Sequence, residues 1–273
     1  MSTRTMTGFA VAVAVVVGTA GCSAGAVTHR ASETAGESAQ AILGALSRAS
    51  DEASQAGSAD IIATVTSPDT GGKPVTMKGL YSWGDGVVME TVMPAKDLQM
   101  EEMVEDGTVT MRVAKGAYYY EVDRIEEGPY KGKTWIRVEM SAVLGEKGAA
   151  AAAQGDPTSA LKSLKYATSA SLIGAESVNG RNAKHYRTSV PAAKMGAASA
   201  DMYKHLGVSG EIVTDVWLDD RGMPARLNQT IGAMAMKMDF LSFGTAKTVE
   251  VPPASDVADM TDFYKEQKQG KAA

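Results

Sequence analysis

Cysteine is almost absent from this sequence: Cys22 is the only one among 273 residues. No intramolecular disulfide can form, so burial of apolar side chains has to stabilise the fold. A lone cysteine in an oxidising compartment is a reactive group unless it is modified. The chemical state of Cys22 is therefore the first question that the sequence raises.

Excess positive charge and a second long apolar run are also lacking. The formal net charge is -5, which argues against nucleic acid as a partner and against electrostatic adhesion to anionic lipids. Beyond the N-terminus, no apolar run approaches the roughly 20 residues of a membrane-spanning helix. Phenylalanine is scarce, with 4 residues, whereas methionine is abundant, with 16. Methionine fits irregular or changing apolar shapes because its side chain is flexible and polarizable.

The N-terminus has the pattern of a secretory signal. Arg4 supplies a positive charge, an apolar run follows over 9–17, and small residues lead up to Gly21. The run is too short to span a membrane. We predict a cleaved signal peptide over residues 1–21.

The segment Thr19-Ala20-Gly21-Cys22 resembles the lipobox of bacterial lipoproteins, with Thr19 where an aliphatic residue is usual. The resemblance implies transfer of diacylglyceryl to the Cys22 sulfur and cleavage after Gly21. Each buried methylene contributes roughly 0.8 kcal/mol, so two or more acyl chains would hold the protein on the outer face of the cell membrane. The alternative is an ordinary secretory signal followed by a chance cysteine.

The remaining chain divides into three predicted parts. Residues 22–36 are small and polar and predict a flexible tether, 37–266 a single domain, and 267–273 a disordered tail. A helix is expected from Ser32 to a point within 53–58, because Ile42 and Leu46 lie at helical spacing.

Beyond this helix the apolar period changes to two, and Asp-Gly or Asn-Gly turns separate short segments. We expect strands at 59–66, 75–83, 87–93, 98–104, 108–113, 117–122, 135–139, 170–178, 183–190, 212–218, 225–231 and 234–243. Further helices are expected from Asp156, over 191–206 and over 256–265, and 141–154 is expected as a helix or a mobile flap. The predicted fold class is α+β: a strongly curved antiparallel half-barrel of about 10–11 strands, with helices covering its concave apolar face.

Alternation within the strands identifies the apolar face. The candidate lining residues of an apolar ligand cavity are Met77, Tyr81, Trp83, Val87, Met89, Val109, Met111, Met234, Met236, Met238 and Phe240. A Met-rich concavity would suit an acyl chain, which needs an apolar wall with little demand on shape. The same stripes would also suit a core packed only against the covering helices, and the pattern leaves both readings open.

Several motifs in the second half resemble the LolA-like lipoprotein superfamily, in particular its LppX/LprG branch from actinobacteria. They are Asp156-Pro157 with Leu161 and Leu164, the hairpin 174–180 with His185-Tyr186, the segment 215–222 with Pro224 and Arg226, and Asp239-Phe240, Phe243-Gly244, Val251-Pro252-Pro253 and Val257. The resemblance implies a half-barrel whose helices plug an apolar cavity, and it implies binding or carriage of lipids or lipoglycans.

Residue patterns of catalysis are lacking. His29, His185 and His205 have no metal-ligand spacing, and neither a Gly-x-Ser-x-Gly elbow nor a phosphate-binding loop occurs. The acidic pairs Glu101-Glu102 and Glu105-Asp106 are expected at a solvated edge. We predict no enzymatic activity, no metal and no cofactor.

The sequence therefore predicts a membrane-anchored lipoprotein whose partner is a lipid or lipidated molecule. The alternative is an envelope sensor or regulatory lipoprotein with the same fold, which acts on a membrane protein partner and transports no ligand. The residues do not decide between the two.

Overall fold

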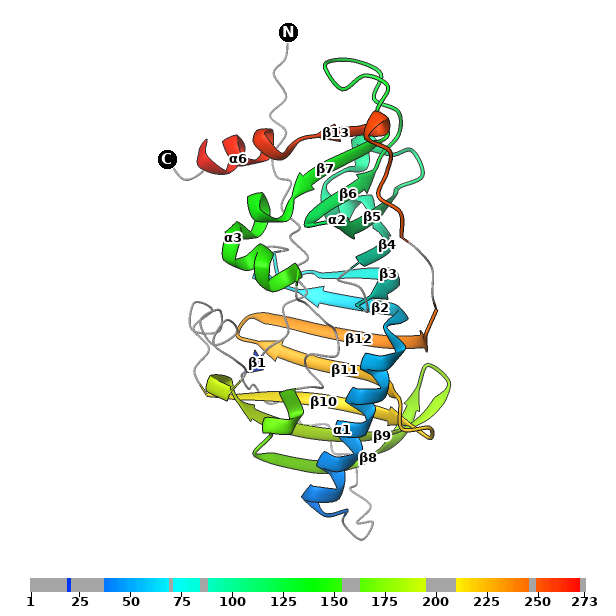
Figure 1. The fold of residues 1–273 in the computed structure, drawn as a ribbon, viewed down its shortest axis with the longest axis vertical. Helices are drawn as coiled ribbons and strands as arrows, with labels where there is room; N and C mark the ends of the chain where they lie inside the picture. The colour runs from blue at the N-terminus through cyan, green and yellow to red at the C-terminus, as the bar shows by residue number, and fades with distance from the viewer. Residues whose placement is uncertain are drawn as a thin grey trace. The chain divides into compact units, whose positions relative to one another are not determined.

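A computed structural model describes residues 19–20, 37–68, 71–83, 88–153, 163–194, 210–245 and 249–270. Its strands are mostly antiparallel and its helices are few, so the predicted α+β class is confirmed (Figure 1). The described residues form two compact units. Unit 1 contains residues 88–153 and 249–270. Unit 2 contains residues 19–20, 37–68, 71–83, 163–194 and 210–245.

Unit 2 is a sheet with the hydrogen-bonded order β3-β2-β12-β11-β10-β9-β8. Its strands are β2 (Ser58–Thr66), β3 (Pro74–Ser82), β8 (Ser169–Val178), β9 (Arg181–Pro191), β10 (Glu211–Asp219), β11 (Pro224–Ile231) and β12 (Met234–Phe243), and the short β1 (Thr19–Ala20) pairs in parallel with β11. The pairing of β2 with β12 joins segments far apart in the sequence.

Helix α1 (Ala39–Ala56) lies across one face of this sheet (Figure 1). Ser38 is the N-cap, because its side chain accepts a hydrogen bond from the backbone of Ala41, and Gly57 ends the helix in the left-handed conformation. The helix packs chiefly against β8, also contacts β11, and buries Ile42 and Leu46. Its predicted end is confirmed, while the predicted start at Ser32 lies outside the described residues.

The hairpin between β8 and β9 forms at the predicted Asn-Gly turn. Asn179 has φ 50° and Gly180 has φ 77°, as the two central residues of a type I′ turn require. The next turn depends on a carboxylate: Asp219 accepts hydrogen bonds from the backbone N–H groups of Arg221 and Met223, each at 3.0 Å. Local residue chemistry therefore sets both turns.

Unit 1 is a smaller sheet with the order β13-β7-β6-β5-β4. Its elements are β4 (Val88–Pro94), α2 (Ala95–Leu98), η2 (Glu101–Met103), β5 (Thr108–Ala114), β6 (Ala117–Glu121), β7 (Trp135–Glu139), α3 (Met140–Ala153), η5 (Ala254–Asp256), β13 (Val257–Asp259) and α6 (Thr261–Gly270). Unit 2 also contains the 3-10 turns η3 (Leu164–Tyr166) and η4 (Ala192–Lys194).

Two local predictions in unit 1 are wrong. The predicted strand 98–104 is instead the end of α2, a left-handed Gln99 (φ 57°) and the 3-10 turn η2, which together bury Leu98 and Met100. The predicted helix 256–265 begins only at Thr261, because Val257–Asp259 pairs in parallel with the edge of β7. A partner distant in the sequence overrides local propensity in that segment.

The helical predictions between these strands are tested only in part. Segment 141–154 is helical as α3 as far as Ala153, interrupted at Gly145, whose φ is 72°. The helix expected over 191–206 begins as β9 and the 3-10 turn η4, and 195–206 lies outside the described residues. The segment from Asp156 to residue 162 also lies outside them.

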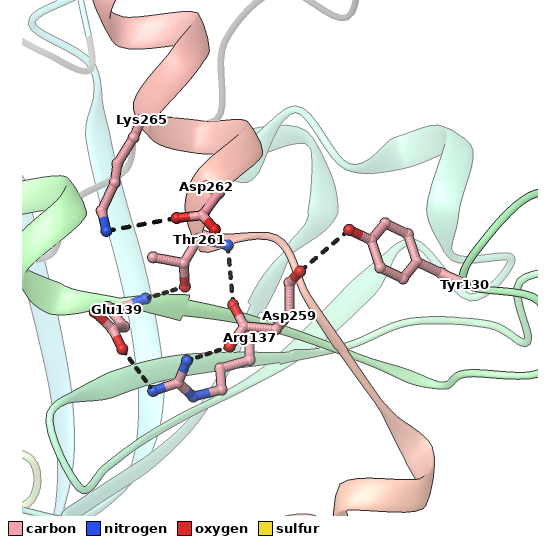
Figure 2. Close-up of polar contacts among 7 residues, drawn as sticks. All are labelled: Tyr130, Arg137, Glu139, Asp259, Thr261, Asp262 and Lys265. Carbon is pink, nitrogen blue, oxygen red and sulfur yellow. Dashed lines mark hydrogen bonds and ion pairs between the residues drawn. The ribbon is translucent and has the colours of Figure 1, made fainter.

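A polar cluster fastens the C-terminal segment to β7 (Figure 2). Arg137 forms ion pairs with Asp259 and with Glu139, and Tyr130 donates a hydrogen bond to the Asp259 backbone oxygen at 3.2 Å. The Asp259 carboxylate also accepts from the Thr261 backbone at 3.0 Å. Burial opposes ionisation of Asp259, but the bonds from Thr261 and Arg137 outweigh it and lower the pKa of the carboxyl.

We expect Asp259→Asn to lower the free energy of unfolding at pH 7 by about 0.5–1 kcal/mol, because it removes a partly exposed ion pair while keeping an acceptor for Thr261. The folded-state pKa lies below the ordinary value of 3.8, so this stabilisation is present above that value and is lost as the pH falls through the folded pKa. Urea unfolding at pH 7 and pH 3 tests this. The exposed Glu266→Gln is the control, and an equal loss at both pH values would contradict the role of the charge.

Candidate functional site

The register of unit 2 places apolar side chains in rows that cross all seven strands on one face. Directly paired residues share a face. One row runs Met77, Ala63, Met238, Leu227, Val216, Tyr186 and Leu172. This is the face on which α1 lies, since the Tyr186 hydroxyl donates to Glu37 beside the helix at 3.3 Å.

The predicted lining residues of unit 2 occupy this face. Met77, Tyr81, Met236, Met238 and Phe240 are buried there. Met234 and Trp83 are half-buried. The Trp83 indole N–H donates to the Ser54 oxygen of α1 at 3.3 Å, and its ring meets Tyr81 edge to face at 5.9 Å. The sequence pattern thus identified a face that is continuous across the strands.

A polar stripe interrupts this apolar face. The row next to Met238 contains Met236, Gln229, Thr214 and Thr188, and all four are buried. Gln229 Nε2 donates to Thr214 Oγ1 at 3.0 Å, and Thr188 Oγ1 donates to the Thr214 backbone oxygen at 3.1 Å. This stripe was not predicted from the sequence, although Gln229 stands between Leu227 and Ile231 at the same-face spacing of a predicted strand.

Two polar atoms in this region are buried without a hydrogen-bond partner: Oε1 of Gln229 and Oγ of Ser50 on α1. An unpaired buried polar group costs about 1–3 kcal/mol, and native proteins keep few of them. A partner that hydrogen-bonds to these atoms would explain why they are kept on an otherwise apolar surface.

Unit 1 also has a buried apolar face. It contains the predicted residues Met89, Val109 and Met111, together with Met93, Val113, Tyr118, Tyr120, Ile136 and Val138. Burial raises the pKa of Tyr118 and Tyr120 above the ordinary tyrosine value. The Tyr118 hydroxyl and Thr91 Oγ1 are buried without a partner. Both units therefore combine methionines with unpartnered polar atoms.

The alternation of apolar and polar residues predicts that the opposite face of unit 1 is exposed to solvent, but part of that face is buried. Ala114, Ala117, Tyr119 and Trp135 form a second small core, against which Val251 and Val257 of the C-terminal segment pack. The Arg112 guanidinium lies 4.6 Å from the Trp135 ring centroid and pairs with Glu90 at 2.6 Å. The C-terminal segment thus covers a face that the strand pattern predicts to be solvated.

His185 lies on the other face of unit 2, away from the methionines. Its Nε2 is 2.8 Å from Asp215 Oδ1, and its ring stacks on Trp217 with centroids 4.0 Å apart. Arg187 contacts both Asp215 carboxylate oxygens. Burial opposes ionisation of Asp215, but bonds from His185 and Arg187 lower the pKa of its carboxyl. Asp215 and Trp217 therefore hold the His185 ring in place on this face.

Within the described ranges, no group of three or more His, Cys, Asp or Glu side chains could hold a metal ion. No helix in the part of the chain that the structure describes is long and apolar enough to cross a membrane. The acidic residues Glu101, Glu102, Glu105 and Asp106 are exposed, as predicted.

The predicted candidates fall into three groups. Met77, Tyr81, Trp83, Met234, Met236, Met238 and Phe240 share one face of unit 2; Met89, Val109 and Met111 share one face of unit 1; Val87 and Cys22 lie outside the described residues. Lipid attachment to Cys22 stays a prediction.

Comparison with solved structures found the lipoprotein LppX of Mycobacterium tuberculosis, at 16% sequence identity and a TM-score of 0.52, over 78% of this chain and 100% of that one. The chain has the fold of LppX. LprF of Mycobacterium bovis also matches, at 11% identity and a TM-score of 0.45, over 79% of this chain and 97% of its own. No family model and no curated protein matches the sequence. The LppX-type fold confirms the fold that the motifs predict.

We expect Met238→Ala to lower the free energy of unfolding by about 2–5 kcal/mol, because Met238 is 1% exposed and lies between Ala63 and Leu227 in its row. Met234→Ala, on the same strand and face but half-buried, should cost clearly less. Urea unfolding of both variants measures the difference. Equal losses would mean that the Met238 side chain is not closely packed.

Proposed function

We propose that this chain is an exported lipoprotein, anchored to the outer face of the cell membrane through acylated Cys22, that binds or carries a lipid or lipidated molecule against its apolar sheet faces. The observation that carries the proposal is the methionine-rich buried face of unit 2. Met77, Met236 and Met238 lie within two adjacent rows of that face.

The choice of methionine supports a variable occupant. A core packed permanently is better specified by Leu, Ile, Val and Phe, whose rotamers are well defined, whereas methionine adapts to different shapes. Buried polar atoms without partners are also a poor feature of a closed core, because each one is desolvated without compensation. A bound lipid would supply acyl chains to the methionines and polar groups to such atoms.

The proposed anchor has its own test. We expect wild-type protein in a bacterial host to fractionate with membranes and Cys22→Ser to move to the soluble fraction, because the serine hydroxyl cannot accept the diacylglyceryl group. Fractionation and intact-mass measurement check this, with Ser23→Ala as a control that keeps the cysteine. An unlipidated wild-type mass would favour the ordinary secretory signal.

Native mass spectrometry tests the ligand. We expect full-length Cys22→Ser protein, purified from an actinobacterial host, to carry extra mass that organic solvent releases as acyl lipid. Met236→Trp should lower the bound fraction while leaving the melting temperature near wild type, because the larger ring would fill ligand space. Ala235→Trp places the same indole ring on the opposite, exposed face of β12 and is the matched control.

The opposite outcome would favour a sensor or regulatory lipoprotein. A protein free of lipid, even after incubation with membrane extract, would have its apolar faces filled by its own side chains. Met236→Trp would then overpack the core and lower the free energy of unfolding by about 1–3 kcal/mol.

A further inference from the structure

Gln229 is the polar residue that β11 contributes to the apolar face of unit 2, and its side-chain amide is buried there. Gln229 is 3% exposed, and Leu227 lies on the same face of β11. In its row, Met236 is the neighbour on β12 and Thr214 the neighbour on β10. The amide thus lies between a methionine and a threonine in the middle of the sheet.

Only the nitrogen of this side-chain amide forms a hydrogen bond. Nε2 donates to Thr214 Oγ1 at 3.0 Å, whereas Oε1 is buried and has no hydrogen-bond partner. An amide oxygen accepts hydrogen bonds and cannot donate them. The missing partner is therefore a hydrogen-bond donor.

The surroundings restrict that donor to a neutral group. The row contains methionine, threonines and valines, and no charged side chain belongs to it among the described residues. A buried charge without a counter-charge is strongly disfavoured, so an ammonium group would not fit beside Gln229. A carboxylate or an ester oxygen would also fail, because neither donates.

The helix above the sheet has a matching feature. Ser50 is 3% exposed, lies on the buried side of α1, and its Oγ has no partner. Helix α1 contacts β11, and the helix and the strand each bury one oxygen without a hydrogen-bond partner. A hydroxyl can both donate and accept, so it can satisfy groups of this kind.

We propose that Gln229 accepts a hydrogen bond from the ligand, and that unit 2 therefore selects a neutral lipid with a free hydroxyl close to its acyl chains. This inference rests on the proposed lipid binding and narrows it to a chemical class. A neutral lipid without a donor would leave the Gln229 oxygen unpaired and would bind more weakly.

Competition between two matched lipids tests the inference. Full-length Cys22→Ser protein, stripped of lipid, is incubated with equal amounts of 1,2-dioleoylglycerol and its 3-O-methyl ether, which differ only in the free hydroxyl. Native mass spectrometry resolves the two complexes in one spectrum. We expect the free hydroxyl to be preferred about 10-fold, which corresponds to about 1.4 kcal/mol and to one net hydrogen bond.

Two variants locate the effect. Gln229→Met, nearly the same in shape, should bind both lipids equally, at the level of the ether in the wild type. Thr230→Val removes a hydroxyl from the next residue, which is exposed on the opposite face of β11, and should keep the preference. If Gln229→Met fails to fold, the ratio of the two lipids bound by the wild-type protein still tests the inference.

The outcomes separate the two proposals. Equal binding of both lipids by the wild type, as a buried water at Gln229 would produce, overturns the inference and leaves lipid carriage intact. Binding of neither lipid by a chain that co-purifies with acyl lipid also overturns the inference alone. Binding of neither lipid by a chain that co-purifies with no lipid overturns the proposed function as well.

Discussion

The cross-strand register of β2 between β3 and β12 is the constraint on which unit 2 depends. It aligns Met77, Ala63 and Met238 in one row, and a shift by one residue would turn every one of these side chains to the opposite face. Since no disulfide can hold the strands, the burial of this face has to stabilise the unit. The register of β11 against β12 places Gln229 beside Met236, so the polar stripe continues a row of the same apolar face.

Unit 1 is also stabilised by a buried apolar face, but it buries part of its second face as well. Its apolar face resembles that of unit 2 in composition, but its other face is covered by the segment that leads into β13. Arg137 and Asp259 then fasten this segment to β7. A chain end that returns to an open sheet edge protects that edge from pairing with other chains.

Most strands could be predicted because each is encoded locally. Period-two alternation, together with turns such as Asn179-Gly180, located β2 to β12. The segments 98–104 and 257–259 could not be predicted in the same way. Met100 is buried from an irregular turn, and Val257 is extended because the edge of β7 is free to pair with it. Both outcomes depend on partners distant in the sequence.

The sequence by itself determined the α+β class, the turn chemistry, the methionine stripes and the isolated position of Cys22 in a signal-like N-terminus. These follow from residue type and spacing, which act over a few residues. Only the tertiary structure decided that Gln229 and Ser50 each bury an unpartnered oxygen, and that the C-terminal segment covers Tyr119 and Trp135. Whether a buried polar atom is satisfied depends on which strands and helices meet around it, and strand spacing alone does not contain that information.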